Sequence, residues 1–249
     1  MVTLNTGLIQ RLKERDSDAW HELWEIFGPA IERMVSSIAG RCFSPETVQD
    51  LRQETLIQVF DRIQSFDSGR GVKFSTWLYA VARHIVCAEL TRRNALKRNR
   101  GLKPLSLDEV VDPGGGAASP ASEFEMQVFR AKVYRAIRLV ERQSSFLEFE
   151  VYKLKVSRPL KAVEIAAVLG ISEASVSRYL RKVRERLRET LRRVVKEYSW
   201  TEEEVGEIGK HRLDGDDDLF DCALGDVYVR VEEEQRRHHR PAQMVEGQV

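Results

Sequence analysis

The sequence predicts an all-α protein made of two small helical domains, a flexible linker and a C-terminal extension. Apolar residues recur at three- and four-residue spacings along most of the chain, and the alternation typical of strands is scarce. Residues 102–122, rich in Gly, Pro and Ala, cannot sustain a packed element. From Lys196 onward, 7 Lys or Arg face 15 Asp or Glu, a net charge of −8, which leaves +9 on the rest of a chain whose total is +1. We therefore expect domains at residues 1–101 and 123–195 and an acidic extension at 196–249.

The first domain opens with two amphipathic helices. Apolar residues at 8, 9 and 12 predict a short helix, and Asp16 or Ser17 can cap a second helix that continues to Ile38. The pair Gly28-Pro29 predicts a kink or an interruption in this second helix, because proline removes a backbone donor.

Two more helices complete the first domain. Pro45 is suited to the first turn of a third helix, whose apolar positions continue to Ile63. A loop follows around Gly69 and Gly71, since glycine permits turn conformations that other residues resist. The stretch from Phe74 to Arg93 then predicts a fourth helix with an apolar stripe that includes Trp77.

The second domain contains a helix-turn-helix pattern from Ala162 to Leu180, preceded by helices at 128–139 and 146–154. Gly170 supplies the left-handed residue of the turn, and Ser172 is a good N-cap for the second helix. A recognition helix presents its N-terminal side chains to base edges and its basic side chains to phosphates. The outward residues that we expect to contact DNA are Glu173, Ala174, Ser175, Ser177, Arg178, Arg181 and Lys182. The alternative is that the helix pair serves packing or protein contact.

Composition narrows the remaining classes of protein. Basic runs at 92–103 and 178–193 suit a polyanion bound at two places, or else they are solvated helix faces. We find no membrane-length apolar run and no signal-peptide pattern, and three distant Cys residues indicate reduced thiols, so we expect a cytoplasmic protein without membrane insertion. Asp214, Asp216 and Asp218 lack the rest of a calcium loop, so no metal and no cofactor is expected.

The order of segments along the chain resembles a known family, and motifs in the first domain carry most of that resemblance. The run Asp50-Leu51-Arg52-Gln53-Glu54-Thr55, followed by Phe60, Phe66-Asp67, Phe74 to Tyr79 and Ala82-Arg83, is similar to the N-terminal domain of the sigma-70 family in its short, extracytoplasmic-function (ECF) form. The resemblance spans roughly residues 5–195. It implies an RNA polymerase sigma factor, with a sigma-2-like helical bundle and a sigma-4-like helix-turn-helix domain.

The resemblance also implies roles for particular residues. Asp50, Gln53 and Glu54 would bind the clamp coiled coil of the largest subunit of the polymerase core. The helix-turn-helix would read the minus-thirty-five element of promoter DNA. Melted DNA needs stacking surfaces and a basic track, and the expected minus-ten residues are Phe66, Lys73, Arg83, His84, Arg92 and Arg93. For Trp77, an anchor in the core is favoured over DNA contact.

The docking helix departs from the family pattern. The family usually carries an acidic cluster here, whereas this chain has Thr47-Val48-Gln49-Asp50, and Arg52 adds an opposite charge. We hypothesise that a Ser/Thr kinase phosphorylates Thr47 and so restores the acidity needed for polymerase binding. The alternative is that Thr47 simply caps the helix. His84 and Ala88 also stand where the family commonly has Asn and Asp.

Three questions stay open in the sequence. The acidic extension is either a regulatory segment that shields the basic helix-turn-helix or a disordered, solvating appendage, and an anti-sigma factor is a further candidate partner. A helix-turn-helix regulator that acts without the polymerase core would explain the second domain but not the motif at Asp50 to Glu54. A recombinase also uses this motif, but we find no nucleophile and carboxylate constellation, so no catalytic residue is expected.

Overall fold

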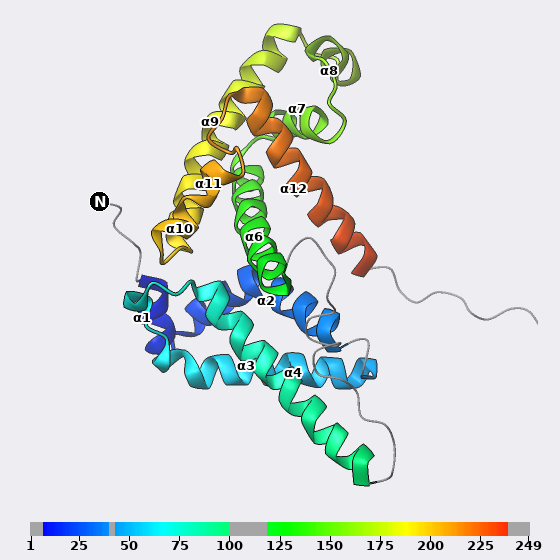
Figure 1. Cartoon of the computed structure of the whole chain (residues 1–249). Helices are drawn as coiled ribbons and strands as arrows, with labels where there is room; N and C mark the ends of the chain where they lie inside the picture. The colour runs from blue at the N-terminus through cyan, green and yellow to red at the C-terminus, as the bar shows by residue number, and fades with distance from the viewer. Residues whose placement is uncertain (1–6, 40–42, 100–118, 239–249) are drawn as a thin grey trace, which may run out of the picture. The chain divides into compact units, whose positions relative to one another are not determined.

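The computed structural model describes residues 7–39, 43–99 and 119–238, and all regular structure within these ranges is helical (Figure 1). The predicted all-α class is therefore confirmed. The chain forms two compact units. Unit 1 comprises the described residues up to Ala131 together with Lys196–Val205, and unit 2 comprises Lys132–Val195 with the described residues from Gly206 onward.

The main body of unit 1 is a bundle of helices: α1 (Gly7–Lys13), α2 (Ser17–Ala39), α3 (Pro45–Arg62) and α4 (Phe74–Asn99). Side-chain caps fix where two of them begin. The Asp16 carboxylate accepts hydrogen bonds from the backbone N–H groups of Asp18 and Ala19 at 2.9 and 3.3 Å, and the Ser44 hydroxyl accepts one from Thr47. The two short 3-10 turns Ile63–Ser65 and Ser68–Arg70 connect α3 to α4.

Helix α2 continues past Pro29, where the sequence predicted a kink or an interruption. The residue before the proline has a packing role of its own, because an added Cβ at Gly28 would lie 2.5 Å from the Trp24 ring. Glycine therefore lets the indole lie against the helix backbone. The apolar face of α2 remains buried on both sides of Pro29, with Leu23 and Ile31 fully covered.

The core of unit 1 lies where α2, α3 and α4 pack against one another. Each helix contributes the apolar face that its sequence period predicted. Full burial of one such side chain stabilises the fold by roughly 1.5–3 kcal/mol. Fully buried members include Leu12, Phe27, Val35, Val59, Phe74, Leu78, Val86 and Leu90.

Unit 2 is built on α6 (Pro120–Gln143), α7 (Phe146–Ser157), α8 (Ala162–Leu169) and α9 (Glu173–Glu197). Helix α6 begins in unit 1 and enters unit 2 after Ala131. Helices α8 and α9 form the predicted helix-turn-helix. Gly170 has the left-handed conformation, with φ of 65°, and Ser172 accepts a hydrogen bond from the Ser175 backbone at 3.2 Å. Both sequence predictions for this turn are confirmed.

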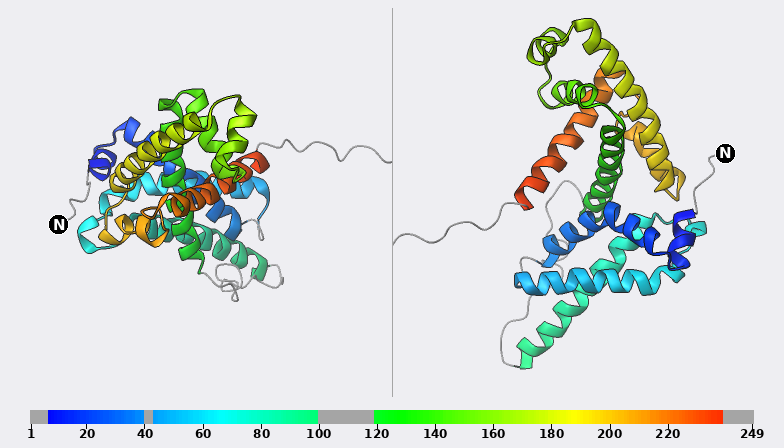
Figure 2. Two further views of the ribbon diagram at one scale, coloured as in Figure 1. Left: turned by 90° about the horizontal axis from the view of Figure 1, so that it is seen from above. Right: turned by 180° about the vertical axis from the view of Figure 1, so that it is seen from behind.

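The C-terminal extension is folded as far as His238, unlike the disordered appendage considered from the sequence. It contains α10 (Glu202–Val205), α11 (Glu207–Lys210) and α12 (Asp217–His238), and α12 packs against α7 within unit 2 (Figure 2). The contact is close, because an added Cβ at Gly225 would lie 2.7 Å from the Val156 carbonyl oxygen. Phe220 and Leu224 are buried in the same unit. The few apolar residues of the extension are therefore enough to fix it.

The ends of the predicted linker differ from the structure in one respect. Helix α6 starts at Pro120, so residues 120–122 are helical, whereas residues 102–118 lie outside the described part of the chain. Among the described residues, no helix has the length and apolar character needed to cross a membrane.

Candidate nucleic-acid interface

The predicted docking residues lie together on the outer side of α3. Asp50, Gln53 and Glu54 are exposed, and Glu54 accepts a hydrogen bond from the Gln58 amide at 2.9 Å. Arg52 on the same helix forms an ion pair with Glu32 on α2. The positive charge of Arg52 is therefore neutralised within unit 1, and it opposes an acidic docking face less than its sequence position suggested.

Thr47 lies in the first turn of α3 but does not cap it. Ser44 takes that role, so the capping alternative for Thr47 is wrong. The Thr47 Oγ1 atom accepts a hydrogen bond from Arg93 Nη2 at 2.8 Å and shares another with the Ser44 hydroxyl at 3.2 Å. The side chain is half-buried, and its hydroxyl faces a guanidinium on α4.

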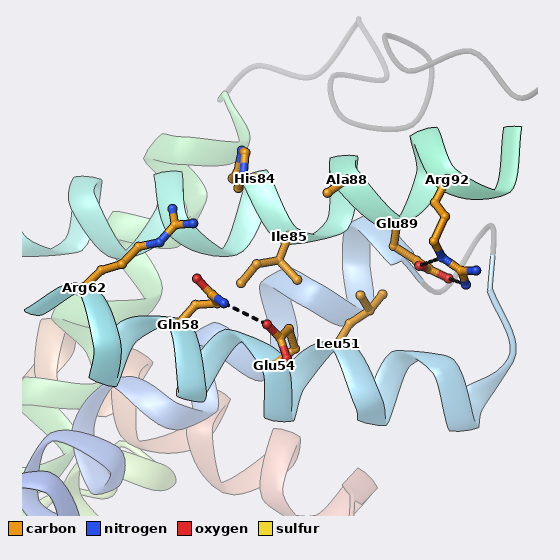
Figure 3. A pocket seen from close by; sticks show the side chains of 9 residues that line it. All are labelled: Leu51, Glu54, Gln58, Arg62, His84, Ile85, Ala88, Glu89 and Arg92. Carbon is orange, nitrogen blue, oxygen red and sulfur yellow. Dashed lines mark hydrogen bonds and ion pairs between the residues drawn. The ribbon is translucent and has the colours of Figure 1, made fainter. Parts of the chain in front are cut away.

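A shallow groove of about 310 Å³ runs between α3 and α4 (Figure 3). It brings one predicted docking residue, Glu54, onto the same surface as two predicted minus-ten residues, His84 and Arg92. Its lining residues are Leu51, Glu54, Gln58, Arg62, His84, Ile85, Ala88, Glu89 and Arg92. Ala88, where the family commonly has Asp, contributes a small apolar side chain to the lining.

The basic residues of α4 differ in how free they are to meet a polyanion. Arg83 and His84 are exposed. Arg92 forms two hydrogen bonds with the Glu89 carboxylate, at 2.7 and 2.8 Å, yet remains 63% exposed. Arg93 also bonds to Glu89, at 2.7 Å, and lies 4.7 Å above the centre of the Phe43 ring.

These two arginines act on the carboxylate that they share. The pKa of Glu89 is lowered because Arg92 and Arg93 donate hydrogen bonds to it, an effect that outweighs its partial burial. Glu89 therefore stays ionised and keeps both guanidinium groups on one side of α4.

Phe66 is a correction to the expected minus-ten set. Its side chain is only 2% exposed, and its ring lies 5.0 Å from Phe74 and 5.5 Å from Trp77. The ring is thus part of the aromatic core of unit 1 and cannot stack on a base in this arrangement. An aromatic residue next to a loop gives the same sequence signal whether its ring faces the core or the solvent.

Lys73 is also less accessible than expected for a lysine that contacts phosphate. The side chain is 13% exposed, and its Nζ atom lies 2.8 Å from a Glu125 oxygen and 3.0 Å from a Glu203 oxygen. Burial alone would lower the pKa of this ammonium, but the two carboxylates outweigh burial, so the pKa lies above its ordinary value. The sequence analysis did not identify either glutamate, because 52 residues separate Lys73 from Glu125 in the chain.

The recognition helix presents most of the expected residues. Glu173, Ala174, Ser177, Arg178 and Arg181 are exposed along the N-terminal part of α9. Ser175 is half-buried, and its hydroxyl lies 3.0 Å from that of Ser172, so its first partner is the turn itself. Lys182 is 48% exposed and pairs with Glu148 of α7 at 2.5 Å.

The acidic extension pairs with the later part of α9. Arg184 bonds to Asp221 at 2.5 Å and to Asp217 at 2.9 Å, and Arg188 bonds to Asp217 at 2.9 Å. Arg178 and Arg181 remain exposed. Within unit 2, the extension therefore pairs with basic residues in the later part of α9 and leaves most of the side chains that we expect to contact DNA exposed, in contrast to the shield considered from the sequence.

In the described ranges, no group of three or more His, Cys, Asp or Glu side chains is placed to hold a metal ion. Cys87 and Cys222 are free thiols, and burial raises the pKa of the Cys87 thiol more than the nearby Arg83 lowers it.

Comparison with known proteins agrees with this arrangement. Residues 24–95 match sigma-70 region 2, a stretch that includes α3 and most of α4. The ECF RNA polymerase sigma factor SigW of Bacillus subtilis (strain 168) is 25% identical over 191 residues, which cover 74% of this chain and 95% of that protein. The helical fold and these two matches support a likeness to sigma factors of the ECF type in the sigma-70 family.

Proposed function

We propose that the chain directs promoter recognition, promoter melting and transcription initiation by bacterial RNA polymerase. The observation that carries this proposal is the region 2 match over residues 24–95. Within these residues, exposed polar residues of α3 and exposed basic residues of α4 line one groove. The helix-turn-helix of unit 2 supplies a second DNA-reading element. The chain contributes binding energy and positioning, and the core polymerase forms the RNA bonds.

Each surface has a proposed role in this function. Asp50, Gln53 and Glu54 bind the clamp coiled coil of the largest polymerase subunit. Arg83 and His84 reach the minus-ten element with Arg92, while Lys73 and Arg93 join them after exchanging their internal partners for phosphates. On α9, the exposed residues Glu173 to Arg181 read the minus-thirty-five element, and Lys182 contacts phosphate beside them.

Run-off transcription with core polymerase tests the function. A pool of templates with randomised upstream sequence is transcribed with and without the protein, and the transcripts are sequenced. We expect start sites that share upstream sequence only when both the protein and the core are present. Binding to duplex DNA without any promoter-specific RNA would instead favour a helix-turn-helix regulator that acts without the core, and DNA cleavage would favour a recombinase.

A charge-reversal variant on α3 tests whether the docking face binds core polymerase. Replacing Glu54 by Lys reverses a charge on an exposed face without touching the core of unit 1. We expect weaker core binding, with duplex DNA binding unchanged because unit 2 is intact. Asp61→Lys makes the same change of two charge units at an exposed position of α3 outside the proposed contact set, and it is the matched control.

A further inference from the structure

A short segment of the extension lies on the minus-ten side of unit 1. Residues Lys196–Val205 belong to unit 1, although the helix before them and the helices after them belong to unit 2. The Glu203 carboxylate from this segment lies 3.0 Å from Lys73 Nζ, and Glu125 from the start of α6 lies 2.8 Å from it. Two carboxylates of the chain therefore take the positions that phosphate oxygens would take beside this lysine.

Trp200 anchors the segment in the aromatic core. The indole is 1% exposed, and its ring centre lies 4.8 Å from that of Phe74 and 6.2 Å from that of Phe27. Phe74, the first residue of α4, directly follows Lys73 in the sequence, so the anchor and the ion pair hold adjacent residues where α4 begins. A buried tryptophan contributes far more than an exposed ion pair, because burial of large aromatic surface is the stronger effect.

The segment is also rigid in itself. The Glu204 carboxylate accepts hydrogen bonds from the backbone N–H groups of Trp200 and Thr201 at 2.7 and 3.0 Å, and Glu204 is 2% exposed. The Tyr198 hydroxyl donates a hydrogen bond to Glu22 on α2. These contacts fix the backbone on both sides of Trp200, so Glu203 is held over Lys73.

We propose that Lys196–Val205 is an autoinhibitory cover, which occupies the phosphate-binding position at Lys73 and has to be displaced before unit 1 engages melted DNA. The proposal rests on the proposed function only for the DNA role of Lys73. The phosphates of melted DNA would compete with Glu203 for Lys73, and the Glu203 side chain is 59% exposed and therefore easily exchanged. The chain thus keeps its basic site occupied until a polyanion is presented at high local concentration.

Zero-length crosslinking tests whether the cover is closed in the free protein. A carbodiimide joins a lysine amine to a carboxylate that touches it, and mass spectrometry of the digested full-length chain identifies the pair. We expect Lys73 coupled to Glu203 and to Glu125, with loss of the Glu203 product when core polymerase and promoter DNA are added. Retention of the full Glu203 yield in a transcribing complex would overturn the proposal.

DNA binding by the full-length chain supplies the second test. Glu203→Gln removes the covering charge, and Glu202→Gln is a matched control because it removes an exposed charge one residue away. On a fluorescent single-stranded oligonucleotide of mixed sequence, we expect Glu203→Gln to bind about two- to fivefold more tightly than the control, as expected for one partly exposed ion pair. Equal affinities would contradict the cover.

A double-variant cycle assigns the gain to Lys73. In a Lys73→Gln background, the substitution Glu203→Gln should bring no further gain, because the site that it uncovers has lost its charge. A gain that persists would come from general electrostatics and would overturn the proposal. Trp200→Ala, checked by circular dichroism for retained helix, should raise oligonucleotide binding above that of Glu203→Gln by releasing the anchor itself.

The outcomes separate this proposal from the function on which it rests. Crosslinking of the free chain and the cycle on a mixed oligonucleotide require no promoter and no polymerase. Suppose that the chain gives no promoter-specific transcript but shows the crosslink and the Lys73-dependent gain in oligonucleotide binding. That result would contradict the proposed function and support the autoinhibitory cover. A chain that starts transcripts normally and shows neither would contradict the cover alone.

Discussion

At the scale of single residues, Thr47 illustrates how structure changes the meaning of a sequence position. The sequence suggested that a phosphate at Thr47 would restore acidity to the docking face. In the structure, the Thr47 hydroxyl already bonds to Arg93, which in turn bonds to Glu89. A phosphate on Thr47 would pair with Arg93 and draw this arginine away from Glu89. Arg93 would then neutralise part of the phosphate charge, so only the remainder would add acidity to the docking face.

The phosphorylation hypothesis therefore has a specific expected outcome. We expect Thr47→Glu to bind core polymerase more tightly than Thr47→Ala, by about two- to fivefold, the range of one solvent-exposed charge interaction. Gln49→Glu, the control, adds the same charge at an exposed position two residues further along α3. Titration of core polymerase with labelled protein measures the affinities, and equal binding by wild type, Thr47→Ala and Thr47→Glu would contradict the switch.

Gly170 gives a prediction about the turn of the helix-turn-helix. Its φ of 65° lies in the left-handed region, and an added Cβ would meet no atom within 4 Å. Gly170→Ala therefore introduces backbone strain without a clash. We expect unit 2 to lose roughly 1 kcal/mol of unfolding free energy. Thermal unfolding measures this loss. The comparison is Gly209→Ala, because Gly209 does not have a positive φ. An equal loss of stability in both variants would contradict the strain argument.

At the scale of elements, the start of α7 is held by one carboxylate. Glu148 belongs to the capping box with Ser145 and pairs with Lys182 and Arg186 of α9. The hydrogen bond from Lys182 is the largest cause of a lowered pKa for Glu148, and it outweighs the burial that would raise the pKa. The carboxylate thus joins the beginning of one helix to the middle of another.

This lowered pKa predicts an acid-sensitive unit 2. A carboxyl group whose pKa is lower in the folded state contributes stability above its unfolded pKa, and that contribution is lost as the pH falls. We expect the wild-type unfolding free energy to decline below about pH 4.3, the ordinary glutamate value. Glu148→Gln should be less stable at neutral pH and lose less on acidification. Urea titrations at pH 7 and pH 3 measure this, and parallel losses in both proteins would contradict it.

The elements also differ in how far the sequence could predict them. Gly170 and Ser172 were predicted correctly because a cap and a left-handed turn depend on residues a few positions apart. Phe66 was misassigned because the burial of a ring depends on partners elsewhere in the chain. The packing of Trp200 on Phe27 and the pairing of Lys73 with Glu203 join residues more than a hundred positions apart. No local pattern encodes such pairs.

At the scale of the whole molecule, the two surfaces that we propose for DNA binding lie on separate compact units. His84 on unit 1 and Arg178 on unit 2 share no partner among their described contacts, so their contributions to promoter binding should be independent. We expect the free-energy losses of His84→Ala and Arg178→Ala in open-complex formation to add to within about 0.5 kcal/mol in the double variant. Measured promoter affinities that depart further from additivity would show that the units are coupled when bound.

The position of Trp200 has a consequence for how the protein is made. Because this buried side chain of unit 1 follows the whole helix-turn-helix in the sequence, the ribosome synthesises most of unit 2 before it adds Trp200. Nascent domains generally fold in the order of their synthesis. Here the first unit emerges with part of its aromatic core unfilled, so a chain that stops short at residue 195 presents exposed Phe74 and Phe27 surface to chaperones and proteases, whereas a full-length chain does not.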